Sequence, residues 1–153
     1  MQSSVDILDE SLRDLFHFLK SRSSWKKISL NANVDIDRPS MAILHILLKN
    51  SPEKLKLMDV ASLLEIEAPY ISRKITELVD QGFIQKSPDP KDKRASYLIP
   101  TLQAKQIDNR INKARYELIQ NAIASWSPLD AQKFGNYHKK FVNDLIKNNK
   151  EFN

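Results

Sequence analysis

Two groups of side chains in this sequence have the chemistry to bind a nucleic acid, and both lie between positions 69 and 94. The first group occupies the outward face predicted for a short helix. There, Arg73 can donate two hydrogen bonds to O6 and N7 of guanine, or hold a phosphate. The small Ser72 permits close approach, whereas Tyr70 and Lys74 can contact base edges or the phosphate backbone. The face comprises Pro69, Tyr70, Ser72, Arg73 and Lys74. The simpler interpretation of this face is a solvated helix surface that binds nothing.

The second group is a charged tip, Pro88–Arg94, between two predicted strands. An arginine at the base of such a hairpin can enter a narrow A·T-rich minor groove, which is the role predicted for Arg94. Lys91 and Lys93 would lie near phosphates. Asp92 would be repelled by phosphate, so we expect it to pair with a nearby arginine and to fix the tip. The alternative is a solvent-exposed loop whose charges keep an edge hairpin soluble.

The elements that must position these groups are two short helices followed by a hairpin. Apolar spacing predicts helices over about 58–64 and from about 67 to 81, which suits a helix-turn-helix with the second helix in the major groove. Gly82 stands where a helix C-terminus favours a left-handed residue. Alternating residues then predict strands at 83–86 and 95–99, and residues 54–56 are a further short strand candidate.

Longer helices are predicted on both sides of this segment. One spans about 5–19, with Ser3 or Ser4 as its N-cap, and residues 21–37 appear as a polar, irregular connector. A buried helix follows to about Asn50, with Asp37 as its cap and Pro39 in its first turn. Two more are predicted near the C-terminus: one is capped by Thr101 and extends to about Ser125, and the other is capped by Ser127.

Composition narrows the classes of function. The 153 residues carry a net charge of +5 and no cysteine, which excludes disulfides, thiolate metal sites and thiol redox chemistry. Six basic and four acidic residues lie between positions 69 and 94, so DNA affinity would depend on their placement and on dimerisation. The N-terminus lacks the pattern of a signal peptide, and no apolar run is long enough to span a bilayer. We therefore expect a cytoplasmic protein that does not bind membranes.

Four segments of this sequence resemble a known family, the MarR family of winged helix-turn-helix regulators. The match lies in residues 57–64 (LMDVASLL), 69–73 (PYISR), 78–84 (LVDQGFI) and 89–94 (DPKDKR). The last segment ends in the family's Asp-x-Arg wing signature. The order of helices agrees with the family over about residues 5–149.

The resemblance implies an obligate homodimer that binds near-palindromic double-stranded DNA. Arg73 falls where relatives often place a base-contacting arginine, and Arg94 where they place the arginine of the minor groove. Glu67 stands where a capping serine is common, and Lys74 and Thr76 replace commoner apolar and acidic residues. These departures bear on which operator is recognised more than on whether DNA is bound.

The helices outside the winged core have apolar stripes that need a partner. We expect them to interlock with the same helices of a second chain, the alternative being packing within one chain. The residues of these predicted dimerisation arms are Leu8, Leu12, Leu15, Phe134, Tyr137, Phe141 and Leu145. Relatives also hold small aromatic or amphipathic molecules between the arms and the DNA-binding lobe. The candidate ligand-binding residues here are Phe16, Trp25, Ile28, His45 and Tyr116.

The sequence thus predicts a mainly α fold with a small β wing, in which a winged helix-turn-helix domain (37–101) carries helical dimerisation arms (1–36 and 102–153). The favoured function is a homodimeric transcriptional regulator, a repressor relieved by a small ligand. The alternative is a winged-helix module that binds an acidic protein partner. We find no spacing typical of a catalytic site, a cofactor loop or a metal site, since the three histidines are scattered.

Overall fold

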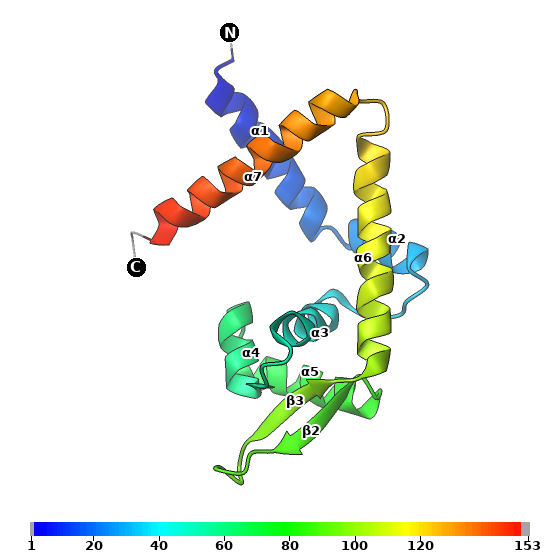
Figure 1. The fold of residues 1–153 in the computed structure, drawn as a ribbon, viewed down its shortest axis with the longest axis vertical. Helices are drawn as coiled ribbons and strands as arrows, with labels where there is room; N and C mark the ends of the chain where they lie inside the picture. Colours follow the sequence, from blue (N-terminus) through cyan, green and yellow to red (C-terminus); the bar gives the residue numbers. More distant parts are fainter. Residues whose placement is uncertain (1, 151–153) are drawn as a thin grey trace. The chain divides into compact units, whose positions relative to one another are not determined.

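The computed structural model describes residues 2–150, with side chains up to residue 148 (Figure 1). The chain divides into two compact units, Met1–Arg115 and Tyr116–Asn153, and the division falls within one helix. The elements in chain order are α1 (Ser4–Lys20), α2 (Arg22–Asn31), α3 (Arg38–Asn50), β1 (Leu55–Lys56), α4 (Leu57–Leu64), α5 (Ala68–Asp80), β2 (Ile84–Pro88), β3 (Ser96–Pro100), α6 (Leu102–Ala122) and α7 (Pro128–Lys150).

Local capping sets where the first and third helices begin. Ser3 Oγ accepts the backbone N–H of Asp6 at 3.2 Å, and Asp6 Oδ2 accepts the N–H of Ser3 at 2.9 Å, which together form a capping box at α1. At α3, Asp37 Oδ1 accepts the N–H of Ser40 at 2.7 Å, and Pro39 lies in the first turn. Ser3 and Asp37 are therefore confirmed as caps.

The prediction of an irregular connector over residues 21–37 is wrong, because α2 occupies Arg22–Asn31. Ser21 Oγ caps this helix by accepting the N–H of Ser24 at 3.1 Å. Trp25 packs against the core, and its Nε1 donates to the carbonyl of Ile36 at 3.0 Å. Trp25 and Ile28 were too few to give a helical period in the sequence, so α2 is stabilised by its cap and by tertiary packing rather than by a strong local pattern.

The core of the first unit lies between the helix-turn-helix and the sheet. Fully buried side chains come from α3, α4, α5 and β2, and α6 adds a stripe of small and branched residues at helical spacing. The largest fully buried side chains are Ile43, Leu44, Val60, Ile71, Ile75, Leu78 and Ile84; the stripe of α6 is Ala104, Ile107, Ile111 and Ala114.

The three strands form one antiparallel sheet in the order β1-β3-β2. Lys86 pairs with Leu98 in the hairpin, and Leu55 of β1 pairs with Leu98 from the other side. The sheet therefore joins the start of the helix-turn-helix to the wing, which extends from one end of this unit (Figure 1). Gly82 has φ +79°, so the predicted left-handed residue after α5 is confirmed, and Thr101 Oγ1 donates to its carbonyl at 2.9 Å.

The second unit contains the end of α6 and all of α7. α6 ends at Ala122, one turn earlier than predicted, and the next residues form a tight turn that carries Trp126. Ser127 is confirmed as the cap of α7, since its Oγ accepts the N–H of Asp130 at 3.1 Å. Trp126 packs edge-on against Phe134, with 5.3 Å between ring centroids. Among the helices of residues 2–150, none is long and apolar enough to cross a membrane.

Candidate nucleic-acid interface

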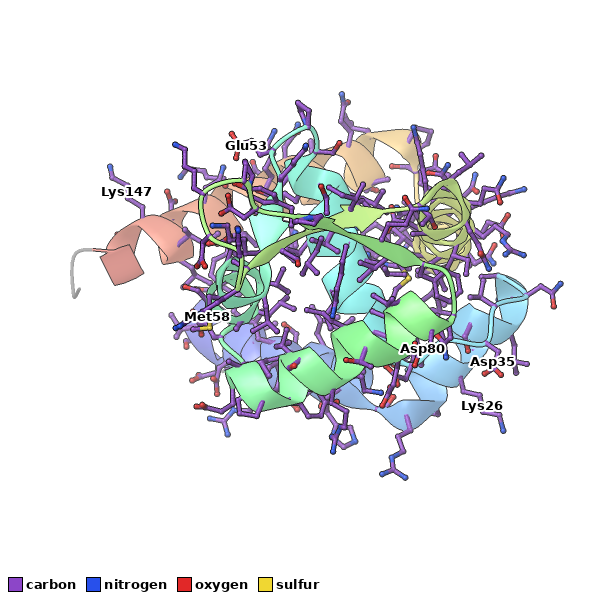
Figure 2. The ribbon with its side chains drawn as sticks, turned by 90° about the horizontal axis from the view of Figure 1, so that it is seen from below. Lys26, Asp35, Glu53, Met58, Asp80 and Lys147 are labelled. Carbon is purple, nitrogen blue, oxygen red and sulfur yellow. The ribbon has the colours of Figure 1, made fainter. Side chains whose placement is uncertain are left out.

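The helix that would enter a groove is α5, which lies along one face of the first unit with Asp80 at its C-terminal end (Figure 2). Its buried stripe, Ile71, Ile75 and Leu78, fixes which side faces the core. The opposite side is polar. Pro69, Ser72 and Arg73 are exposed there, whereas Tyr70 is half-buried and packs against the core.

Tyr70 lies where it can orient Arg73. The guanidinium carbon of Arg73 lies 5.2 Å from the centroid of the Tyr70 ring, within cation–π distance. Within the described residues Arg73 forms no ion pair, so its donors remain available. An arginine held against an aromatic face loses less conformational entropy when it binds a base edge or a phosphate.

Lys74 differs from Arg73 in its surroundings. Its Nζ lies 2.5 Å from Asp37 Oδ2 and 2.9 Å from Glu77 Oε2, and its side chain is only 14% exposed. The hydrogen bonds to Asp37 and then to Glu77 raise the pKa of Lys74 above its ordinary value. This ammonium group is therefore charged but already paired within the protein, which the spacing of charges along α5 did not indicate.

The wing tip is only partly solvent-exposed. Residues 91–94 are exposed, whereas Asp89 is only 4% exposed, so the base of the tip is buried. Asp89 Oδ2 lies 2.5 Å from Lys56 Nζ, and its Oδ1 accepts the N–H of Lys91 at 2.8 Å. The hydrogen bond from Lys56 holds the pKa of Asp89 below its usual value. Lys56 thus ties the start of α4 to the base of the tip.

Asp92 does not take the role predicted for it. In the described part of the chain it forms no ion pair with an arginine side chain; its Oδ1 accepts the backbone N–H of Arg94 at 2.9 Å. Aspartate commonly bonds to the backbone two residues on, and this local contact competes with pairing to a distant side chain. Asp92 therefore shapes the turn directly before Arg94.

One residue of the first predicted group and two of the second line a cleft of about 410 Å³ between α4, α5 and the wing. Ser72 of α5 and Arg94 of the wing both line it, together with Lys86. Met58, which also lines this cleft, is a largely exposed methionine near the start of α4 (Figure 2). Lys86 and Arg94 on the wing side can contact a phosphodiester backbone, and the carboxylates of Asp59 and Asp92 also line the cleft.

A second cleft, of about 290 Å³, contains three of the five predicted ligand-binding residues. Trp25, Ile28 and His45 line it, and the sequence reasoning missed two guanidinium groups there, those of Arg38 and Arg115. Their roles depend on how α2, α3 and α6 pack, so no local motif signals them. Phe16 is an exposed residue of α1 outside this lining, and Tyr116 is an exposed residue of the second unit.

A helix-turn-helix followed directly by an antiparallel hairpin defines the class of winged helix-turn-helix proteins. Residues 36–96 match the model of the MarR family, which confirms the predicted resemblance over this segment. The curated proteins contain no match to the sequence.

Solved structures share the fold at low sequence identity. A MarR family protein from Bacillus stearothermophilus superposes with a TM-score of 0.80 at 17% identity, covering 94% of this chain and 96% of that one. The transcriptional regulator Tm0710 from Thermotoga maritima gives 0.67 at 17% identity, with 92% and 95% covered. A MepR variant from S. aureus bound to an oligodeoxyribonucleotide gives 0.64 at 18% identity, with 88% and 97% covered.

Proposed function

We propose that this protein is a homodimeric, sequence-specific double-stranded DNA-binding regulator of transcription, and that it acts as a repressor. The observation that carries the proposal is the cleft lined by Ser72 of α5 and by Lys86 and Arg94 of the hairpin. It lies in the segment that matches the MarR family model, and the MepR variant of the same fold is bound to an oligodeoxyribonucleotide. Double-stranded DNA is therefore the partner that best fits these charges.

Four exposed cations have a role in this proposal. Arg73 contacts a base edge or a phosphate in the major groove, and Arg94 enters the neighbouring minor groove. Lys91 and Lys93, both exposed at the wing tip, neutralise phosphates. Two copies of α5 in a dimer would enter successive major grooves about one helical turn apart, which makes the operator near-palindromic.

The cleft lined by Trp25, Ile28 and His45 is the proposed effector site, and its apolar walls suit a small aromatic or amphipathic molecule. Arg38 and Arg115 add two cationic donors to the lining. An effector relieves repression only if it binds the DNA-incompetent state more tightly, because equal affinity for both states shifts no population.

The test is fluorescence anisotropy of the full chain on duplex DNA from its own upstream region and on a scrambled duplex, over a salt series. We expect selective binding with two chains per site, and we expect Arg94→Ala to weaken binding and to reduce the salt slope by about 1. Equal, weak binding to both duplexes, with no enrichment from a random-duplex selection, would refute the proposal.

A further inference from the structure

One ion pair joins the outward helix α5 to the beginning of α3. Lys74 Nζ lies 2.5 Å from Asp37 Oδ2, across 37 positions of sequence. Asp37 uses its two oxygens for different purposes: Oδ1 caps α3 by accepting the N–H of Ser40, and Oδ2 binds the lysine. Glu77 also binds Lys74, at 2.9 Å, but it lies on α5 itself and joins no second element.

The residue next to Asp37 continues the connection in another direction. Arg38 Nη2 donates to the carbonyl of Ser21 at 3.2 Å and to Oγ of the buried Ser24 at 3.2 Å. Its guanidinium carbon also lies 5.6 Å from the centroid of the Trp25 ring. Ser21 is both the C-cap of α1 and the N-cap of α2. The start of α3 is thus bound to α5 on one side and to the corner between α1 and α2 on the other.

An exposed ion pair would contribute little to folding and would hold nothing in place. Lys74 is different, because most of its side chain is covered and its Nζ has two carboxylate partners. Charge-assisted hydrogen bonds of this kind fix geometry as well as adding energy. Since a bidentate contact between arginine and guanine tolerates little misalignment, a small rotation of α5 would displace Arg73, one residue before Lys74, from a base edge.

We propose that the Lys74–Asp37 ion pair positions α5 for DNA recognition, and that Arg38 extends this link to Trp25 in the proposed effector cleft. Lys74 is then a positioning residue rather than a phosphate contact. This inference rests on the proposed function, since it specifies how that interface is held and how it is connected to the effector cleft.

The sharpest test compares Asp37→Asn with Glu77→Gln. Each substitution removes one negative charge from Lys74, so electrostatics alone predicts that both strengthen DNA binding. If the Lys74–Asp37 ion pair instead positions α5, the two substitutions should have different effects on DNA binding. Asparagine still caps α3, but its neutral amide oxygen binds the ammonium group less strongly, so Asp37→Asn should weaken selective binding by roughly 3- to 30-fold. Glu77→Gln should leave binding unchanged or slightly tighter.

The salt series separates positioning from phosphate contact. Lys74→Gln should weaken binding to the selected duplex without changing the salt slope, whereas loss of a phosphate contact lowers the slope by about 1. The double variant Asp37→Asn/Lys74→Gln should bind no more weakly than the weaker single variant, because both lose the same pair. Circular dichroism melting of each variant confirms that the helices remain folded.

The outcomes distinguish this inference from the proposed function. If the wild-type protein binds no duplex selectively, the proposed function fails. If the wild-type protein binds selectively and Asp37→Asn binds as tightly or more tightly, only the positioning role is overturned. A reduced salt slope for Lys74→Gln would also overturn it, because it would make Lys74 a phosphate ligand.

A fluorescence measurement tests the proposed connection through Arg38 to Trp25. The chain has two tryptophans, so Trp126→Phe leaves Trp25 as the single tryptophan fluorophore. In that background, selected duplex should change the Trp25 emission relative to scrambled duplex, and adding Asp37→Asn should reduce this change at saturating DNA. Unchanged Trp25 emission in the Trp126→Phe protein on binding selected duplex would overturn the extension to the effector cleft.

Discussion

Two lysines near the candidate interface have partners within the protein, and this separates them from the cations that face solvent. Lys56 is paired with Asp89, and Lys74 with Asp37. In the sequence they carry the same charge as the exposed cations of α5 and the wing tip. Because a paired and partly covered ammonium must lose its partner before it binds a phosphate, the exposed cations are the better candidates for DNA contacts.

The first prediction concerns two exposed cations. Arg73→Ala should cost about 1–3 kcal/mol of binding free energy and relax selectivity at one operator position, if Arg73 reads a base. Lys91→Ala should weaken binding about equally on all sequences and lower the salt slope by about 1. Anisotropy on the selected duplex and on single-site variants measures both effects. Equal losses on every duplex after Arg73→Ala would make Arg73 a phosphate contact instead.

The second prediction uses the buried carboxylate of the wing. Pairing with Lys56 lowers the pKa of Asp89, so the folded state is stabilised when this carboxylate is ionised. That contribution is present above the ordinary aspartate pKa of 3.8 and is lost as pH falls through the lower, folded value. Asp89→Asn should therefore be less stable than wild type at pH 7, and the difference should shrink by pH 3.

Urea midpoints of both proteins at several pH values measure this difference. Asparagine keeps an acceptor for the N–H of Lys91, so the local turn is retained and the charge is what changes. A stability difference that stays constant between pH 7 and pH 3 would show that the Lys56–Asp89 charge pair is not its cause.

At the scale of elements, the two glycines occupy different positions: one follows a helix in the left-handed conformation, and the other lies inside a helix. Gly82 follows α5 with φ +79°, and a Cβ there would lie 3.5 Å from Gln103 Oε1, an ordinary contact. The obstacle to a side chain is thus the left-handed backbone and not a lack of space. Gly135 lies within α7, where a Cβ would meet nothing within 4 Å.

The third prediction is that alanine has opposite effects at these two positions. Gly82→Ala should destabilise the fold by about 1 kcal/mol, since it forces alanine into the left-handed region. Gly135→Ala should stabilise α7 by roughly 0.5–1 kcal/mol, because alanine loses less backbone entropy in a helix. Thermal unfolding followed by circular dichroism gives the sign of each change. A loss of stability in both variants would contradict the placement of Gly135 within a helix and away from other side chains.

At the scale of the whole molecule, apolar side chains remain uncovered on α1 and α7. The described residues of α1 include none that is buried, although Leu15 and other apolar residues repeat at helical spacing. On α7, Tyr137 is 70% exposed, and Phe134 and Leu145 are about half exposed. Exposed apolar surface of this extent marks an interaction site. It supports the proposal that a second copy of the chain covers both helices.

The fourth prediction tests that dimer. Leu15→Glu and Tyr137→Glu should each shift the protein toward monomers in sedimentation velocity and lower its affinity for a two-site duplex, because a monomer contacts one half-site. Leu63→Glu is the matched control for sedimentation, since Leu63 is 52% exposed on α4, which lies outside the predicted arms. A wild-type protein that sediments as a monomer at micromolar concentration would contradict the proposed homodimer.

The sequence by itself determined where most elements begin and end. Ser3, Asp37 and Ser127 each bond to a backbone N–H three residues on, and Gly82 alone supplies the left-handed residue after α5. Such interactions act over a single turn, so they can be identified in the sequence without knowing the fold. The same locality explains why the helix-turn-helix and the hairpin were predicted close to their observed bounds.

Only the tertiary structure decided which charges are free and which are paired. Lys74 meets Asp37 across 37 positions, and Lys56 meets Asp89 because β3 brings β1 and the wing into one sheet. The helix α2 likewise depends on the packing of Trp25 against a distant core. A distant partner is fixed by how the elements pack in three dimensions, so charge and spacing along the chain do not specify it.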